Sequence, residues 1–195
     1  MTSRDDILAR IRANQPAPMP LPELPALVPG GSSALVARFK AGVARMGGKV
    51  LEASEGLEQA LRALHPEAKV VASATREYRG NRRLDARTVP ASLADVDVGV
   101  VRARFGVAET GSVWITDEEF RVNALGFLSQ HLVVLLDPAR IVADMHHAYG
   151  RREEFDAGYG VFMTGPSATA DIEGILIHGA QGIRSLSVVL RAPGS

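Results

Sequence analysis

The chain has 195 residues, equal numbers of basic and acidic residues (22 each), and no cysteine. The length suits a single well-buried domain, and the balanced charge gives no general electrostatic attraction for nucleic acid. Without cysteine the chain cannot form a disulfide, a thiolate zinc site or an iron–sulfur cluster of its own. The N-terminal segment is charged instead of continuously apolar, and no apolar run approaches the roughly 20 residues of a membrane span, so we expect a cytoplasmic protein that does not span the membrane.

The first 31 residues predict a helix followed by an extended arm. Ser3 and Asp6 have the spacing of a capping box. An apolar stripe follows at helical spacing: Ile7, Leu8 and Ile11. Six prolines between residues 16 and 29 prevent continuous helix or strand hydrogen bonding. We therefore divide the chain into an N-terminal helix and proline-rich arm, residues 1–31, and a single α/β domain, residues 32–195.

Helix and strand patterns alternate from residue 32 onward. Apolar residues at steps of three and four predict a helix that ends at the glycine pair 47–48. The apolar runs 49–52 and 68–73 predict strands, and Ser54 begins a helix between them. This succession is typical of a parallel sheet with crossover helices.

The second half of the chain is richer in strand patterns. Two β-rich runs predict an antiparallel hairpin within residues 98–115, and the apolar run 131–137 predicts a buried strand. Pro138 then has the position of a first helical residue, and the spacing of Ile141, Val142 and Met145 predicts the buried face of the helix that it begins. The runs 161–164 and 185–190 predict the last strands. Together the patterns predict an α/β fold with an open, mostly parallel sheet flanked by helices.

The segment from Thr164 to Glu173 reads Thr-Gly-Pro-Ser-Ala-Thr-Ala-Asp-Ile-Glu and follows an apolar run. This order is typical of a strand, a Gly-Pro turn and the first turn of a helix, where free N–H groups and hydroxyls hold small anions. The candidate ligand contacts are Thr164, Gly165, Ser167, Thr169, Asp171 and Glu173. The alternative is helix capping by the hydroxyls, with the carboxylates favouring the positive end of the helix.

A second candidate is Glu109, which precedes Thr110 and Gly111 between two β-rich runs. Glycine lets the backbone approach a ligand closely, and Glu109 could serve as a catalytic base, nucleophile or hydroxyl acceptor. The alternative is a solvent-facing glutamate beside a bulge glycine. Because open parallel sheets bind ligands at the carboxyl ends of their strands, we expect Glu109 and Ser167 to share one cleft there.

A third candidate is the arginine-rich loop 76–84, which follows the strand that ends at Ser73. We expect Arg76 or Arg79 at the rim of the same cleft, binding an anionic small molecule. The alternative is a solvated surface loop. The five histidines show no metal-ligand spacing, and the chain has no G-x-S-x-G, G-x-G-x-x-G or P-loop motif. We therefore expect no metal site.

Two motifs resemble a known family: Ala-Glu-Thr-Gly-Ser-Val at 108–113 and the run from Thr164 to Leu190. They resemble the LUD-domain family, and within it the short LutC or YkgG type, lactate utilization protein C. The resemblance implies a fold similar to the NagB, RpiA and CoA-transferase superfamily. It also implies the non-redox component of a cytoplasmic system that oxidises L-lactate to pyruvate. In that system partner proteins carry the iron–sulfur clusters, and this chain holds no cofactor.

Two other functions remain open from the sequence. The arginine loop and the Gly-Pro-Ser turn favour a stand-alone enzyme or binding module for a phosphorylated, CoA-linked or folate-like metabolite. The proline-rich arm is the one feature that favours a structural scaffold. The sequence leaves open whether the chain itself is an enzyme.

Overall fold

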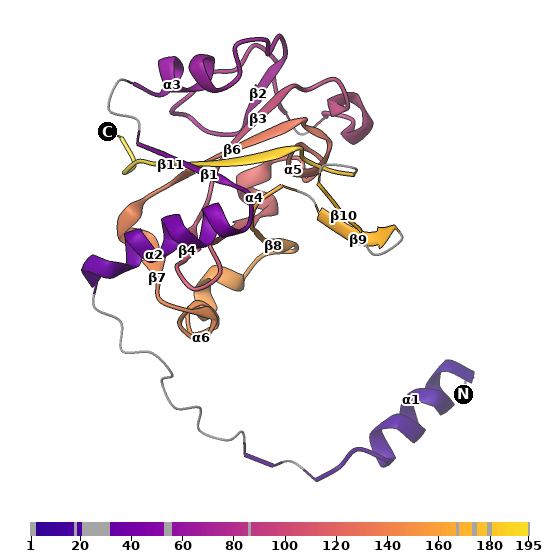
Figure 1. Cartoon of the computed structure of the whole chain (residues 1–195). Coiled ribbons are helices and arrows are strands. Elements are labelled where there is room, and N and C mark those ends of the chain that lie inside the picture. Colours follow the sequence, from indigo (N-terminus) through magenta and orange to yellow (C-terminus); the bar gives the residue numbers. More distant parts are fainter. Residues whose placement is uncertain are drawn as a thin grey trace.

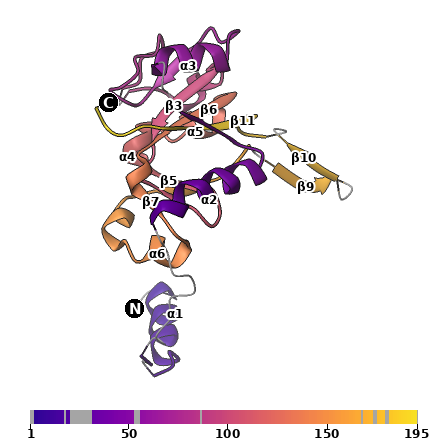
Figure 2. The same cartoon turned by 60° about the vertical axis from the view of Figure 1, so that its left-hand side comes forward.

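The computed structural model describes residues 3–17, 19–20, 32–52, 56–85, 87–166, 168–172, 175–178 and 181–194. Helix α1 (Ser3–Ala13) stands apart from the other elements, which form stacked layers (Figures 1 and 2). In order, the layers are helix α3 (Leu57–Leu64), a five-stranded sheet, helix α2 (Ser32–Arg45) with a four-stranded sheet, and helix α6 (Met145–Tyr149).

The five-stranded central sheet is parallel throughout, with the order β1-β11-β6-β3-β2. Its strands are β1 (Lys49–Glu52), β11 (Ser185–Leu190), β6 (His131–Leu136), β3 (Val98–Arg102) and β2 (Val71–Ser73). Strand β6 is apolar along its length because both faces of the sheet are covered. Leu132 and Val134 face one core, while Val133 and Leu135 face the other. The predicted α/β fold with an open, mostly parallel sheet flanked by helices is confirmed.

Helices cover both faces of the central sheet. Leu57 and Leu61 of α3 are buried in the core on one face. Phe39 and Val43 of α2, four residues apart, are fully buried in the core on the opposite face. The predicted end of this helix is confirmed, because Gly47 follows it with a φ of 81°, a left-handed conformation that glycine adopts readily.

The second sheet has four strands in the order β7-β4-β5-β8. They are β7 (Ile141–Val142), β4 (Phe105–Val107), β5 (Ser112–Thr116) and β8 (Gly160–Met163). Strands β4 and β5 form the predicted antiparallel hairpin, whereas β3 belongs to the central sheet. The two sheets approach closely at Gly106, where a Cβ would lie 2.8 Å from a methyl carbon of Leu136.

The continuous helix expected from Pro138 is wrong. The segment forms a 3₁₀ turn η2 (Pro138–Arg140), then β7, and only afterwards helix α6. The start was predicted correctly, since the Asp137 carboxylate accepts the N–H of Ala139 at 2.9 Å. The two β-branched residues that follow pair with β4, and this pairing overrides the helical spacing. The other short elements are η1 (Pro90–Leu93), α4 (Asp117–Phe120), α5 (Leu125–Leu128) and η3 (Arg152–Phe155).

A two-stranded hairpin stands where a helix was expected after the Gly-Pro turn. Strand β9 (Ala168–Ile172) pairs antiparallel with β10 (Ile175–His178), and neither pairs with the two larger sheets. The reason lies in the residue types, because both strands contain β-branched threonine or isoleucine and only two residues separate them. Those two residues, 173 and 174, lie outside the described ranges. Figure 1 shows the hairpin projecting from the layered body.

Candidate functional site

A cleft of about 1070 Å³ opens between the end of α2, helix α5, strand β8 and the segments that enter β9 and β11. Its walls include Arg45, Met46, Phe127, Leu128, Thr164 and Gly165. Three wall segments lead directly into β1, β6 and β11, so the cleft lies at the amino ends of the central strands. The expectation that this region would lie at the carboxyl ends is therefore wrong.

The two stretches singled out in the sequence touch at this cleft. The hydroxyl of Thr164 lies 3.2 Å from the carbonyl oxygen of Thr110 and 3.3 Å from that of Gly111, and donates toward both. Strand β8 pairs with β5, and this pairing aligns the end of one strand with the turn before the other. Residues 109–111 and 164–165 are thus neighbours, although more than 50 residues separate them in the sequence.

Both glycines of these stretches are used for close approach to helix α2. A Cβ on Gly111 would lie 2.3 Å from the Val43 nitrogen, and a Cβ on Gly165 would lie 2.0 Å from the carbonyl oxygen of Met46. Both glycines also have positive φ angles, 70° and 65°. They hold the C-terminal end of α2 against the second sheet, which places Arg45 and Met46 at the cleft.

Glu109 is exposed and engaged at both its backbone and its side chain. One carboxylate oxygen accepts the N–H of Met145, the first residue of α6, at 3.1 Å. The carbonyl oxygen of Glu109 accepts from the Arg45 guanidinium at 3.0 Å. A carboxylate at a helix N-terminus is favourable electrostatically. Glu109 thus helps to anchor α6, and it is connected to the cleft through Arg45.

The other predicted ligand contacts of the segment from Thr164 to Glu173 lie either in strand β9 or outside the described residues. Thr169 and Asp171 lie in strand β9 and not in the first turn of a helix. Ser167 and Glu173 lie outside the described residues. The expectation that Glu109 and Ser167 share one cleft therefore also lies outside them. Glu109 itself is not among the residues that line the cleft of Thr164.

Arg76 and Arg79 lie at a different cleft, of about 610 Å³, together with Ser73 and Thr75. This cleft follows β2, which is the edge strand farthest from β1 in the central sheet. The expectation that either arginine lies at the rim of the Thr164 cleft is therefore wrong, because the arginine loop follows the carboxyl end of β2 whereas the Thr164 cleft lies at the amino ends of β1, β6 and β11. Both arginines are exposed, and neither guanidinium has a hydrogen-bond or ion-pair partner among the described residues.

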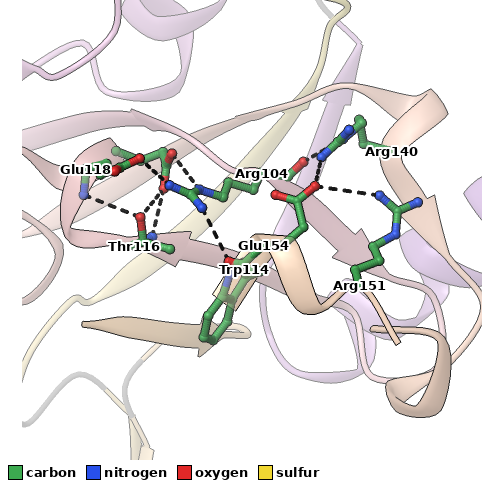
Figure 3. Close-up of polar contacts among 8 residues, drawn as sticks. Arg104, Trp114, Thr116, Glu118, Arg140, Arg151 and Glu154 are labelled. Carbon is green, nitrogen blue, oxygen red and sulfur yellow. Dashed lines mark hydrogen bonds and ion pairs between the residues drawn. The ribbon is translucent and has the colours of Figure 1, made fainter. Parts of the chain in front are cut away.

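An arginine network connects the two sheets near the carboxyl end of β3 (Figure 3). The guanidinium of Arg104 is only 15% exposed and binds Glu119 at 2.8 Å and also Glu118. It further donates to the Glu154 carbonyl oxygen at 3.3 Å, and the same oxygen accepts the Trp114 indole N–H at 2.9 Å. The Arg104 guanidinium thus joins α4 to η3, and the shared Glu154 oxygen adds Trp114 of β5 to the network.

Arg140 extends this network, and Arg102 forms a separate ion pair beside it. Arg140 donates to the Arg104 carbonyl oxygen at 3.0 Å and pairs with Glu154, while Arg102 binds Glu77 through two nitrogens. A cleft of about 490 Å³ lies between these arginines, but each guanidinium is already bound to a carboxylate. Sequence analysis missed the network, and its one local signal is the Arg-x-Arg pattern at the end of β3.

Two histidines stack at the amino edge of the central sheet. The rings of His65 and His131 have centroids 4.2 Å apart and an angle of 23° between their planes. His131 Nδ1 lies 2.8 Å from the Ser185 hydroxyl, while His65 Nε2 is buried with no hydrogen-bond partner among the described residues. Burial, His131 and Lys49 lower the pKa of His65 to about 4. Sequence analysis missed this pair, because His65 ends helix α3 and His131 begins strand β6, and only the packing of α3 on the central sheet brings them together.

Within the described ranges, no three His, Asp or Glu side chains are grouped so that they could hold a metal ion. None of the helices in that part of the chain combines the length and apolar character needed to cross a bilayer.

A family model described as the LUD domain matches residues 61–190. The chain belongs to the LUD-domain family. The LUD match begins within α3 and ends at the last residue of β11, so it includes the second sheet and four of the five central strands. Helix α2 and strand β1 precede it, which means that Arg45 and Met46 of the cleft come from outside the LUD match.

A structural neighbour supports the LUD fold. The crystal structure of a DUF162 family protein from Deinococcus radiodurans superposes with a TM-score of 0.62, covering 83% of this chain and 99% of that one at 14% identity. In sequence, the present chain is 28% identical over 104 residues to the uncharacterized protein NMB1437 of Neisseria meningitidis serogroup B. That match spans 52% of this chain and 45% of the relative, which is less than half of the relative's length.

Proposed function

We propose that this LUD protein is the non-redox component of a cytoplasmic system that oxidises L-lactate to pyruvate, of the LutC or YkgG type. The family is associated with lactate utilization, and the match to its domain over residues 61–190 carries the proposal. Oxidation of lactate releases two electrons and two protons. The chain has no cysteine with which to hold an iron–sulfur cluster, so iron–sulfur partner proteins accept the electrons.

The cleft at Thr164 supports a binding role more than lactate chemistry. Its volume of about 1070 Å³ and walls of Met46, Phe127 and Leu128 suit an apolar body much larger than lactate. The polar groups at its wall are few and include the Arg45 guanidinium and the Thr164 hydroxyl. We propose that this cleft receives a large, mostly apolar group with one anionic end near Arg45.

We propose Thr110, Gly111, Thr164 and Gly165 as the wall of this site. The hydrogen bonds from Thr164 to the turn at Thr110 support their placement in one wall. Glu109 is proposed as the reactive carboxylate, reached from the cleft past Arg45. The segment that continues through Ser167, Thr169, Asp171 and Glu173 is proposed to border the same site from the hairpin side.

Growth on L-lactate tests the proposed function. Deletion of the gene should abolish growth on L-lactate as sole carbon source and leave growth on pyruvate unchanged. The wild-type gene should restore growth. A strain that lacks the gene and any paralogue, yet grows normally on L-lactate, would contradict the proposal. Purification of the tagged protein under anaerobic conditions should also recover an iron-containing partner.

The arginine loop favours a second candidate function, the binding of an anionic metabolite. Arg76 and Arg79 lack an acidic partner among the described residues, and the hydroxyls of Ser73 and Thr75 line the same cleft. This cleft is suited to a phosphate or carboxylate group. A ligand present at a hundred times its Kd should stabilise the protein by roughly 2.7 kcal/mol.

A thermal-shift series with inorganic phosphate, an acyl-CoA and a folate tests this second candidate. The double substitution Arg76→Ala and Arg79→Ala should remove the shift. Arg62→Ala, which removes an exposed arginine outside this cleft, is the control. Absence of a shift with every compound would rule the candidate out.

A further inference from the structure

Helix α1 presents an uncovered apolar stripe. Ile7 is 59% exposed, Ile11 is 54% exposed, and no residue of the helix is buried. A helix of 11 residues is marginally stable alone in water, because its few hydrogen bonds barely offset the cost of nucleation. A persistent helix of this length therefore needs a surface against which to pack.

The cleft at the amino edge of the central sheet presents such a surface. Met46, Phe127 and Leu128 at its wall are 44%, 38% and 39% exposed, although all three are large and apolar. Exposed apolar side chains that gather around one hollow mark a binding surface. An amphipathic helix placed in an apolar groove, with apolar contacts three and four residues apart, is a common mode of recognition. Ile7, Leu8 and Ile11 have this spacing.

The chain is long enough to bring the helix to this cleft. Residues 14–31 join α1 to α2, and an extended proline-rich segment of that length can span up to about 56 Å at roughly 3.1 Å per residue. Helix α2 is only about 21 Å long at 1.5 Å per residue, and its C-terminal end forms one wall of the cleft. The reach of the connection therefore exceeds the distance along α2.

We propose that α1 docks into the Met46–Phe127–Leu128 cleft of its own chain, with Ile7, Leu8 and Ile11 facing the cleft. A tether of this length holds the helix at an effective concentration on the order of 1 mM near its own domain, far above the micromolar concentration of a second copy. The occupant is thus the helix of the same chain, and docking closes the cleft to other ligands. This inference does not depend on the proposed role in lactate oxidation.

Disulfide trapping tests the docked state without background, because the chain has no cysteine. The pair Ile7→Cys and Leu128→Cys should form an intramolecular disulfide under mild oxidation, visible as a faster monomer band on a non-reducing gel. The matched control is Ala9→Cys with Leu128→Cys, since Ala9 lies about 200° around the helix from Ile7 at 100° per residue. The first pair should react roughly tenfold faster, which corresponds to a preference of about 1.4 kcal/mol for one helix face.

Two outcomes of trapping would overturn the proposal. Equal rates for the two pairs would mean that α1 samples the cleft only as a free tethered segment. A cross-linked dimer in place of the monomer band would mean that the helix occupies the cleft of a second copy. Both pairs use the full chain and leave Met46 and Phe127 unchanged, so folding of the domain is preserved.

A second measurement uses an apolar dye that reports uncovered apolar surface. The double substitution Ile7→Asp and Ile11→Asp should undock the helix and increase dye fluorescence about twofold. Ala9→Asp, on the opposite side of α1, should leave the fluorescence at the wild-type level. If the double substitution does not change dye binding, the cleft is uncovered in the wild-type protein and the proposal is wrong.

Discussion

Gly42 of helix α2 and Gly111 of the β4–β5 turn are in backbone contact, and a Cβ on Gly42 would lie 2.7 Å from the Gly111 nitrogen. The atoms that this Cβ would meet first are backbone atoms of Thr110 and Gly111, which cannot rotate away as a flexible side chain would. The contact allows α2 to lie directly against the turn that carries Glu109. The position of Arg45 and Met46 at the cleft therefore depends on two residues that have no side chain.

Gly42→Ala should destabilise the protein by about 1–3 kcal/mol, because the added methyl group forces α2 away from the turn. Chemical denaturation monitored by Trp114 fluorescence measures this loss, and Trp114 is the single tryptophan of the chain. Gly150→Ala is the control, since a Cβ there would meet its nearest atoms at 3.4 Å. Equal stability of the two variants would show that the α2 contact tolerates a methyl group.

Arg104→Met should cost about 2–3 kcal/mol, because it leaves the largely buried carboxylate of Glu119 without its partner. The exposed pair of Arg62 and Glu58, with side chains 78% and 66% exposed, provides the comparison. Arg62→Met should cost less than about 0.5 kcal/mol. Urea denaturation of both variants tests the difference, and a cost for Arg104→Met as small as that of the surface control would show that the network does not hold the two sheets together.

The stacked histidines predict a loss of stability in mild acid. The pKa of His65 is lowered to about 4 in the folded protein from 6.5, mainly by burial, so the unfolded chain binds the proton more tightly between these values. Stability should be fully present above pH 6.5 and should fall as the pH is lowered toward 4. The loss should be about 1–2 kcal/mol, since the ring is partly solvated.

Denaturation curves between pH 4 and 8 measure this effect, and His65→Gln should flatten the dependence. The lowered pKa values of Asp97 and Asp144, caused chiefly by backbone hydrogen bonds, act in a separate window below their ordinary value of 3.8. An unchanged pH dependence in His65→Gln would assign the acid sensitivity to other groups.

Substitutions of Glu109 separate its role in anchoring α6 from a reactive role of its carboxylate. Glu109→Ala removes the acceptor for the Met145 N–H and should cost about 0.5–1 kcal/mol, whereas Glu109→Gln keeps an acceptor and should cost less. Growth on L-lactate is measured for both variants alongside stability. If Glu109→Gln is as stable as wild type yet abolishes growth, the carboxylate has a reactive role. Normal growth of both variants would limit Glu109 to the anchoring of α6.

Elements with long apolar runs were predictable from the sequence, and short ones were not. Strands β6 and β11 are six residues long and apolar, so their type follows from composition alone. Strand β7 has two residues and exists because β4 lies beside it, a fact that no local pattern contains. The membership of β3 in the central sheet likewise depends on its pairing with β2 and β6, which no local pattern contains. The division of the chain at residue 31 stays a prediction.

Only the part of the candidate site that two paired strands bring together was predictable from the sequence. The contact between Thr164 and Thr110 follows from the pairing of two neighbouring strands, and both stretches had been singled out. Arg76 is separate from Thr164 because the two lie at opposite ends of the central strands, and composition does not specify which end of the sheet each segment meets. The histidine pair likewise depends on how the end of α3 packs against the start of β6.

Strand β11 inserts between β1 and β6, so the last strand of the sheet in sequence lies near its middle. During translation, a nascent chain that has emerged as far as residue 178 already contains β1, β2, β3 and β6. In that intermediate β1 has no neighbour in the central sheet, and the edge of β6 that will receive β11 is unpaired. Such an edge is open to wrong pairing with other strands, and the central sheet can be completed only after β11 has been synthesised.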